Sequence, residues 1–141
     1  MNNSINPQLT KQVIIGTKSQ SRKKIFRQLN MKFQYRSADI NEKKVKNLKN
    51  DKYDALKIAK AKAAVLSKKY RNKIIITFDT TILYNKKTIY KCNTPECCKK
   101  ILQSFNKRSH SLYTAMVFMV NNSLIKSSLT ETKIAFKNNR R

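Results

Sequence analysis

The apolar and polar positions near the N-terminus predict a strand, a loop and a helix. Residues 13–15 are a β-branched run, V-I-I, that ends at Gly16, and apolar residues then recur at helical spacing over residues 25–29. The hydroxyl of Ser19 is placed to cap this helix by accepting a hydrogen bond from its first turn. A second short strand is expected over residues 32–37.

A longer helix is predicted further along the chain, ending near Tyr70. Starting from Leu56, its apolar residues fall at i, i+3, i+7, i+10 and i+14, which places them on one helical face. We expect Asp51 to cap this helix and Asp54 to supply a negative charge in its first turn. An exposed polar loop over residues 43–50 precedes the helix.

The second half of the chain contains further β-runs and one clear helix start. The β-runs cover residues 74–78, 80–84, 111–120 and 124–136. The sequence T-P-E at residues 94–96 combines a cap, a proline and an acid, which is typical of a helix start, and apolar residues follow at 98–105. The polar N-N-S at residues 121–123 predicts a hairpin turn. In this order the elements predict an α/β fold, a mixed sheet with packed helices.

The length of 141 residues and the 40% hydrophobic content fit a single small domain. We expect this domain over residues 12–137, between a polar N-terminal tail of residues 1–11 and a basic tail of residues 138–141. No apolar stretch approaches the length that spans a bilayer, and the N-terminal tail has no apolar segment. These patterns predict a cytoplasmic protein that does not bind membranes.

The charge of the chain points to anionic partners. Thirty-two basic and seven acidic residues give a net charge of +25, which attracts nucleotides and allows non-specific polyanion binding. The lysines are spread along the whole chain and are not gathered in one motif with aromatic residues, as a nucleic-acid reader would have them. The charge therefore indicates a class of partner and leaves the function open.

The sulfur and imidazole groups give little sign of chemistry. Cys92, Cys97 and Cys98 are odd in number and lack a second pair downstream, so reduced thiols are favoured over disulfides or a metal site. The single histidine, His110, has no spacing that links it to a thiol. Nucleophilic catalysis by cysteine is therefore not favoured.

Asp79 has the most informative position in the sequence. It follows an apolar β-run in a chain with only seven acidic residues, and the ends of such strands carry ligand chemistry in open α/β sheets. Asp39, Glu42 and Asp79 are candidates for holding Mg²⁺ or Mn²⁺, which prefer oxygen ligands and bridge to phosphates. The alternative is that Asp39 and Glu42 are solvated loop charges.

The basic segment over residues 17–24 is a candidate phosphate cradle. It places hydroxyl, lysine and arginine side chains around a helix N-terminus, whose free N–H groups and dipole attract anions. The spacing of a P-loop is missing. A solvated basic helix is the alternative interpretation.

Several short motifs, in the right order, resemble the Maf family of nucleoside triphosphate pyrophosphatases. The resemblance extends from Val13 to Lys137. Residues 16–22 are similar to the family pattern A-S-x-S-P-R-R, residues 39–42 to D-I-D-E, and residues 58–63 to L-A-x-x-K-A. Residues 77–82 are similar to G-A-D-T-V-V and residues 90–92 to G-K-P. Residues 105–116 are similar to L-S-G-R-T-H-x-V-Y-T-G-V, and residues 130–136 to V-E-T-T-x-V-x-F.

The resemblance implies a fold like that of Maf and inosine triphosphate pyrophosphatases, and a hydrolase. The expected reaction converts a nucleoside triphosphate to the monophosphate and diphosphate, by metal-assisted attack of water on the α-phosphate. The pair Asp79 and Thr80 looks more like the branch that acts on dTTP and UTP. A homodimer is a further expectation, because the closing β-runs would otherwise leave an exposed edge.

The resemblance also implies a role for each residue that falls on a motif. Asp79 would be the proton acceptor, and Asp79 with Glu42 would hold the divalent cation, Mg²⁺ or Mn²⁺. The remaining motif residues would bind the substrate phosphates: Ser19, Arg22, Lys62 and Lys91.

The chain departs from the family pattern at several positions. Ser21 and Gln20 replace the first arginine and the proline of the family loop, and Thr77 and Phe78 replace the glycine and alanine before the aspartate. Each change is expected to crowd or weaken the phosphate site. Lys107 and Ala115 replace glycines, which would be costly if those turns need a positive φ. The family pattern continues with a D-K-A-G-x-Y-G-I-Q-G motif that this sequence does not contain, so the C-terminal elements are expected to be missing. The alternative function is that of an inactive, truncated relative that binds anions or nucleic acid.

Overall fold

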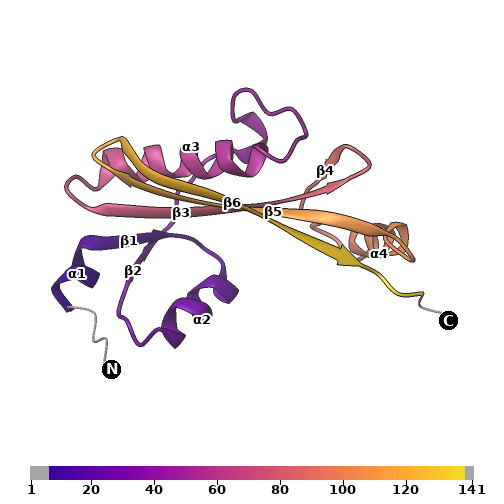
Figure 1. Ribbon diagram of the computed structural model, residues 1–141, viewed down its shortest axis with the longest axis horizontal. Coiled ribbons are helices and arrows are strands. Elements are labelled where there is room, and N and C mark those ends of the chain that lie inside the picture. Colours follow the sequence, from indigo (N-terminus) through magenta and orange to yellow (C-terminus); the bar gives the residue numbers. More distant parts are fainter. Residues whose placement is uncertain (1–6, 139–141) are drawn as a thin grey trace.

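A computed structural model describes residues 7–138, which form a six-stranded mixed sheet with helices on both faces (Figure 1). The elements are α1 (Pro7–Gln12), β1 (Val13–Gly16), α2 (Gln20–Gln28), β2 (Gln34–Arg36), η1 (Glu42–Lys44), α3 (Asp54–Lys69), β3 (Ile74–Tyr84), β4 (Lys87–Ile89), α4 (Pro95–Ser104), β5 (Ser109–Val120) and β6 (Ser123–Ala135). The expected α/β fold with a mixed sheet is confirmed. Of the predicted tails, residues 1–6 and 139–141 lie outside the described residues, and residues 7–11 belong to α1.

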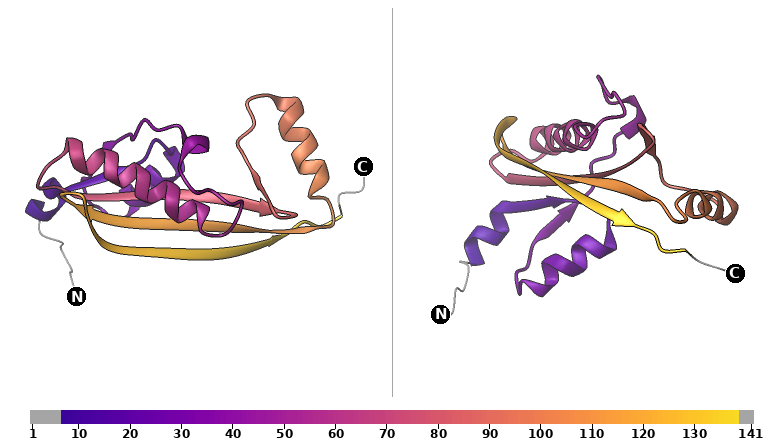
Figure 2. Two further views of the ribbon diagram at one scale, coloured as in Figure 1. Left: turned by 90° about the horizontal axis from the view of Figure 1, so that it is seen from above. Right: turned by 45° about the vertical axis from the view of Figure 1, so that its right-hand side comes forward.

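The N-terminal half builds the parallel part of the sheet. β1 pairs in parallel with β2 on one side and with β3 on the other. The helix after β1, α2, lies on one face of the sheet, and the helix after β2, α3, lies on the opposite face (Figure 1, Figure 2). In open α/β sheets, ligands bind beyond the carboxyl ends of the strands, at the point where the chain changes from one face of the sheet to the other. The fold therefore directs attention to the carboxyl end of β1 and the adjoining part of β3.

The C-terminal half extends the sheet with antiparallel strands. β5 lies between β3 and β6, and the short β4 folds back onto the end of β3. Asn121 and Asn122 have positive φ angles of 46° and 67°, and this confirms the predicted hairpin turn between β5 and β6. No helix among the described residues is both long enough and apolar enough to cross a membrane.

The core lies between α3 and the central strands. Ala55, Ala59 and Ala63 are fully buried on one side of α3, and their small side chains allow the helix to approach the sheet closely. The hydroxyl of Thr77 in β3 donates a 2.7 Å hydrogen bond to the carbonyl oxygen of Ala59. This bond satisfies a fully buried polar group and fixes α3 at the middle of β3.

Gly16 is the only glycine of the chain, and it ends β1 at a point of close approach. A Cβ atom at this position would lie 2.7 Å from Cδ1 of Leu66 and 2.7 Å from Cγ2 of Thr77. Leu66 and Thr77 are both fully buried, so neither has free space into which it can move. The absence of a side chain at Gly16 is therefore what lets α3 and β3 pack at the end of β1.

Two local predictions about the strands and caps are wrong. Residues 74–78 and 80–84 form one continuous strand, β3, because its pairing with β5 runs on through Asp79, which lies opposite Ala115. The N-cap of α3 is Tyr53 and not Asp51. The Asp51 carboxylate accepts a hydrogen bond from the Tyr53 backbone N–H, in the turn that precedes the helix. The expected first-turn charge of Asp54 is confirmed.

The predictions for the shorter helices are confirmed in position and only partly in packing. Ser19 caps α2, and Thr94 caps α4 with proline at its first position. Ile25 in α2 and Leu102 in α4 remain 58% and 57% exposed, so neither helix buries a complete apolar face. α4 stands away from the sheet (Figure 2), and the apolar residue that it anchors is Phe105 at its end.

The two replaced glycines have different outcomes. Lys107 adopts a positive φ of 57° in the turn before β5, so the expected backbone cost applies there. Ala115 lies inside β5 and is fully buried, and its backbone is that of an ordinary strand residue. The concern about a positive φ at Ala115 is therefore wrong.

We predict that Gly16→Ala destabilises the protein by about 1–3 kcal/mol, because the added methyl group has to displace well-packed side chains. The free energy of unfolding, measured by urea denaturation, checks this. Ser128→Ala on the exposed outer strand is the control and should change the value by less than about 0.5 kcal/mol. Equal stability of Gly16→Ala and the wild type would contradict the packing described here.

Candidate functional site

The candidate site lies at a gap in the sheet beside β3. β1 ends where Gly16 pairs with Thr77, and along β3 the pairing with β4 starts at Ile82, opposite Ile89. Residues 78–81 of β3 therefore pair with β5 on one side, while the described residues supply no partner strand on the other. Because side chains alternate along a strand, residues from both faces of the sheet border this opening.

On the α3 face, one lysine holds two carboxylates. The Lys62 ammonium lies 2.8 Å from Oδ1 of Asp79 and 2.6 Å from Oε1 of Glu42. The side chains of Lys62 and Asp79 are only 14% and 8% exposed, whereas that of Glu42 is 48% exposed. The Thr81 hydroxyl donates a 3.3 Å hydrogen bond to the other oxygen of Asp79. This arrangement places a buried carboxylate, with its counter-ion, at the opening.

Opposing influences act on the pKa of Asp79. Burial raises this pKa above its ordinary value, and the neighbouring Glu42 carboxylate raises it further. The Lys62 ammonium acts in the other direction, through its charge and its hydrogen bond. Burial has the largest effect, so the net direction is upward. A carboxyl group whose pKa is raised in this way is better suited to accept a proton near neutral pH.

On the α2 face, Arg22 lies against β3. Its Nη2 donates a 2.9 Å hydrogen bond to the Thr80 hydroxyl, and its Cζ lies 5.4 Å from the centre of the Phe78 ring. The Ser19 hydroxyl accepts from the Arg22 backbone N–H at 3.4 Å, as an N-cap does. Burial lowers the pKa of the Arg22 guanidinium, while the Asp79 and Glu42 carboxylates raise it. Arg22 therefore presents a partly desolvated positive charge at the opening.

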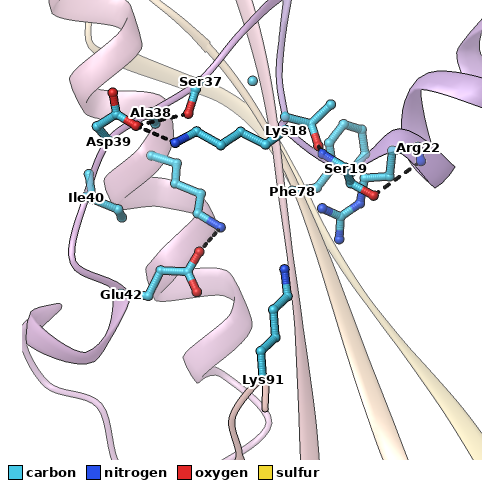
Figure 3. A pocket seen from close by; sticks show the side chains of 13 residues that line it. Lys18, Ser19, Arg22, Ser37, Ala38, Asp39, Ile40, Glu42, Phe78 and Lys91 are labelled. Atoms are coloured by element: carbon cyan, nitrogen blue, oxygen red, sulfur yellow. Dashed lines mark hydrogen bonds and ion pairs between the residues drawn. The ribbon is translucent and has the colours of Figure 1, made fainter. Parts of the chain in front are cut away.

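Two adjoining cavities, of about 210 Å³ and 130 Å³, bring the predicted residues together. Lys91, which follows β4, points into the space between Glu42 and Arg22 (Figure 3). Ser19 lines the larger cavity and Asp79 lines the smaller one. Both cavities share four residues: Arg22, Glu42, Lys62 and Lys91. Every residue to which the sequence assigned a site role thus lines one or both cavities.

Asp39 behaves differently from the other two candidate metal ligands. Its Oδ1 lies 2.7 Å from the Lys18 ammonium, and the two side chains are 81% and 74% exposed (Figure 3). This contact with Lys18 lowers the pKa of Asp39. Asp39 lines the outer wall of the larger cavity, where it forms a solvated ion pair with Lys18.

Glu42 and Asp79 have the chemistry that a divalent cation requires. Both offer carboxylate oxygens, and both lie within 2.8 Å of one position that already holds a positive charge, the Lys62 ammonium. Among the described residues, no group of three or more histidine, cysteine or acidic side chains could hold a metal. Mg²⁺ is commonly bound by one or two carboxylates together with substrate phosphates. The pair therefore fits a cation whose other ligands come from the substrate and water.

Phe78, which was expected to crowd or weaken the phosphate site, lines the larger cavity and also contacts α2. Its ring packs 5.8 Å from the Phe26 ring of α2 and beneath the Arg22 guanidinium. Sequence analysis also missed Thr114 of β5, whose hydroxyl lies 3.1 Å from that of Thr80. The strand register determines this contact, because Thr80 pairs directly with Thr114. Neither residue has a local pattern that would have identified it.

The histidine and the cysteines lie elsewhere. His110 stacks against Phe105 and Phe136, at centroid distances of 4.3 Å and 5.5 Å, and burial lowers its pKa. Cys92 is a free thiol whose pKa is raised to about 12, first by its hydrogen bond with Cys97. A thiol with so high a pKa is a poor nucleophile at neutral pH.

Comparison with known proteins supports a single family. The family model described as Maf-like protein matches residues 12–141. A Pelagibacter ubique protein named nucleoside triphosphate pyrophosphatase is 27% identical over 135 residues, which are 92% of this chain and 69% of that protein. A Pyrococcus furiosus protein named dTTP/UTP pyrophosphatase is 28% identical over 127 residues, which are 90% of this chain and 65% of that protein. The chain thus spans about two thirds of the length of these relatives.

A solved structure supports the fold. The Staphylococcus aureus Ham1 protein superposes with a TM-score of 0.52 at 11% sequence identity. The similarity covers 87% of this chain and 69% of the Ham1 chain. At this identity the similarity concerns the fold alone.

We predict that Lys62→Met raises the pKa of Asp79, because the substitution removes the charge and the hydrogen bond that oppose burial. The Asp79 carboxyl resonance, titrated by ¹³C NMR, checks this. Lys60→Met, on the exposed side of α3, is the control and should leave the titration unchanged. An unchanged Asp79 pKa in Lys62→Met would contradict the ion pair.

The same substitution should change how stability depends on pH. The pKa of Asp79 is higher in the folded chain than its ordinary value, so folding is favoured at low pH and this contribution is lost as the pH rises through the folded-state pKa. In Lys62→Met this loss should be larger. Urea denaturation between about pH 4 and pH 7 measures it.

Proposed function

Because this chain belongs to the Maf family, we propose that it hydrolyses nucleoside triphosphates to the monophosphate and diphosphate. The observation that carries this proposal is the buried Asp79 carboxylate beside Lys62, at an opening lined by further cationic side chains. The names of the relatives from Pelagibacter ubique and Pyrococcus furiosus support the reaction. The Asp79-Thr80 pair and the Pyrococcus relative support dTTP and UTP as substrates.

The cationic side chains bind the triphosphate. Arg22 and Lys91 enter the opening from opposite sides, from α2 and from the segment after β4 (Figure 3). The Ser19 hydroxyl accepts the Arg22 N–H, so its own hydrogen remains available to a phosphate oxygen. The N-terminus of α2 adds its dipole to this charge. Together these groups neutralise the substrate charge and orient the phosphate chain.

Asp79 accepts the proton from the attacking water. Burial raises its pKa towards neutrality, while Lys62 favours the ionised form that can accept a proton. The Thr81 hydroxyl holds the second carboxylate oxygen in place. Attack on the α-phosphorus then expels the diphosphate, whose charge the cationic side chains stabilise.

Glu42 and Asp79 would hold a divalent cation, Mg²⁺ or Mn²⁺, which when bound neutralises charge that develops on the phosphates and orients water. The Lys62 ammonium now occupies the position between the two carboxylates. With a cation bound to the carboxylates, this ammonium would be available to a phosphate oxygen. Lys62 would then act as a phosphate ligand, whereas in the free chain it is the counter-ion of the two carboxylates.

A second candidate function is supported by the charge. The net charge of +25 favours binding of anions or nucleic acid without turnover, as an inactive relative would show. Such binding weakens steeply with rising salt and does not depend on Asp79. Pyrophosphatase activity, in contrast, depends on Asp79 at fixed salt.

We predict that Asp79→Asn lowers the rate of diphosphate release from UTP or dTTP by roughly 10²- to 10⁴-fold, the usual contribution of a general base. Release is measured with Mg²⁺ or Mn²⁺ present and again after chelation, which should also abolish it. Asp51→Asn, an equivalent substitution outside both cavities, is the control. Release that persists in Asp79→Asn would overturn the proposed mechanism, and anion binding without release from a folded wild-type chain would favour the second function.

A further inference from the structure

Phe78, Thr80 and Thr114 form a support beneath the Arg22 guanidinium. We propose that these three residues are positioning residues, which hold Arg22 in the orientation that binds phosphate and so determine the affinity of the site for polyphosphate. This inference rests on the proposed function, because it concerns the same opening. It adds a role for three residues that do not themselves carry charge.

The aromatic part of the support connects a helix to a strand. The Phe78 ring lies 5.4 Å from Cζ of Arg22 and 5.8 Å from the Phe26 ring, and both of these partners belong to α2. A guanidinium at this distance from a ring is attracted to its face. Phe26 also packs edge-on against Phe33, at 5.3 Å, so the ring cluster is fixed from the loop side as well. Phe78 thereby sets the position of the helix and of the side chain that the helix carries.

The hydroxyl part of the support connects Arg22 to the centre of the sheet. Nη2 of Arg22 donates to the Thr80 hydroxyl at 2.9 Å, and this hydroxyl lies 3.1 Å from that of Thr114. Arginine can only donate, so Thr80 accepts from it, and either hydroxyl can donate in the contact between Thr80 and Thr114. Thr80 and Thr114 are directly paired residues of β3 and β5. The hydroxyl chain therefore rests on a rigid base, the paired strands β3 and β5.

The support affects phosphate binding because Arg22 lines both cavities of the opening. It is the only arginine among the described residues that line the two cavities. Arginine recognises phosphate through a planar fork, and holding that fork in place beforehand reduces the entropy lost on binding. The Phe78 ring lines the larger cavity but offers no hydrogen bond to a phosphate, so we expect its main influence on binding to pass through its contact with Arg22.

The test is a double-mutant cycle with inorganic tripolyphosphate, whose binding to the full chain is measured by titration calorimetry. Phe78→Leu and Thr80→Val should each weaken binding by roughly 2- to 30-fold, the range expected for losing a cation–π contact or a comparable hydrogen bond. In an Arg22→Gln background, the same substitutions should cause no further weakening. Thr80→Ser keeps the hydroxyl and should restore binding.

The control is Phe118→Leu, the same substitution on the same face of the sheet. Phe118 of β5 pairs with Ile76, which precedes Phe78 by two residues in β3 and so shares its face of the sheet. Its replacement should change binding by less than about twofold. Circular dichroism confirms that each variant is folded, and Thr80→Val, which keeps the shape of the side chain, carries the test if Phe78→Leu does not fold.

Additive effects in the Arg22→Gln background would overturn the positioning role, as would wild-type affinity in both single variants. A folded wild-type chain that does not bind tripolyphosphate would overturn it too. Diphosphate release from UTP is measured separately. If the effects on tripolyphosphate binding are coupled but no diphosphate is released, the positioning role stands and the proposed hydrolysis is refuted. If diphosphate is released but the effects on binding are additive, the hydrolysis stands and the positioning role is refuted.

Discussion

The ion pair between Lys62 and Asp79 is the interaction on which the candidate site depends. Asp79 lies inside a continuous strand, with its side chain only 8% exposed, and an isolated carboxylate there would be strongly unfavourable. Lys62 reaches it because the buried alanines of α3 allow the helix to pack closely on β3. The Lys62 ammonium therefore both stabilises the fold, as the partner of a buried carboxylate, and affects the pKa of that carboxylate in the opening. A change that shifts α3 would also change the pKa of Asp79.

The place of the site follows from where β1 ends. After Gly16 the chain leaves the sheet to form the loop that caps α2, and β4 joins β3 only from Ile82 onward. The intervening edge of β3 is reached from one face by α3 and from the other by α2. This geometry explains how carboxylates and an arginine that lie on opposite faces border a common opening. A β1 strand four residues longer would pair with residues 78–81 and close the gap.

The sequence was sufficient for much of the fold, and for the site only through residues with local signals. The proline and cap at Thr94 and Pro95, the Ser19 cap and the Asn121-Asn122 turn each act within a few residues, so their pattern was readable. β4 has three residues, too few for a periodic pattern. The continuity of β3 depends on its unbroken pairing with β5, in which Asp79 lies opposite Ala115, and no local pattern contains this. The resemblance to a family supplied the candidate residues, but the contacts of Phe78 and Thr114 depend on the strand register and on α2, and these had to come from the structure.

In the proposed reaction, this opening directs water to the α-phosphorus of a nucleoside triphosphate. The most direct test is hydrolysis of UTP in water enriched in ¹⁸O, with the products analysed by mass spectrometry. The account predicts that the heavy oxygen appears in UMP and not in the released diphosphate, because the bond that breaks lies between the α-phosphorus and its bridging oxygen. Heavy oxygen in the diphosphate or in inorganic phosphate, or the absence of UMP, would contradict it.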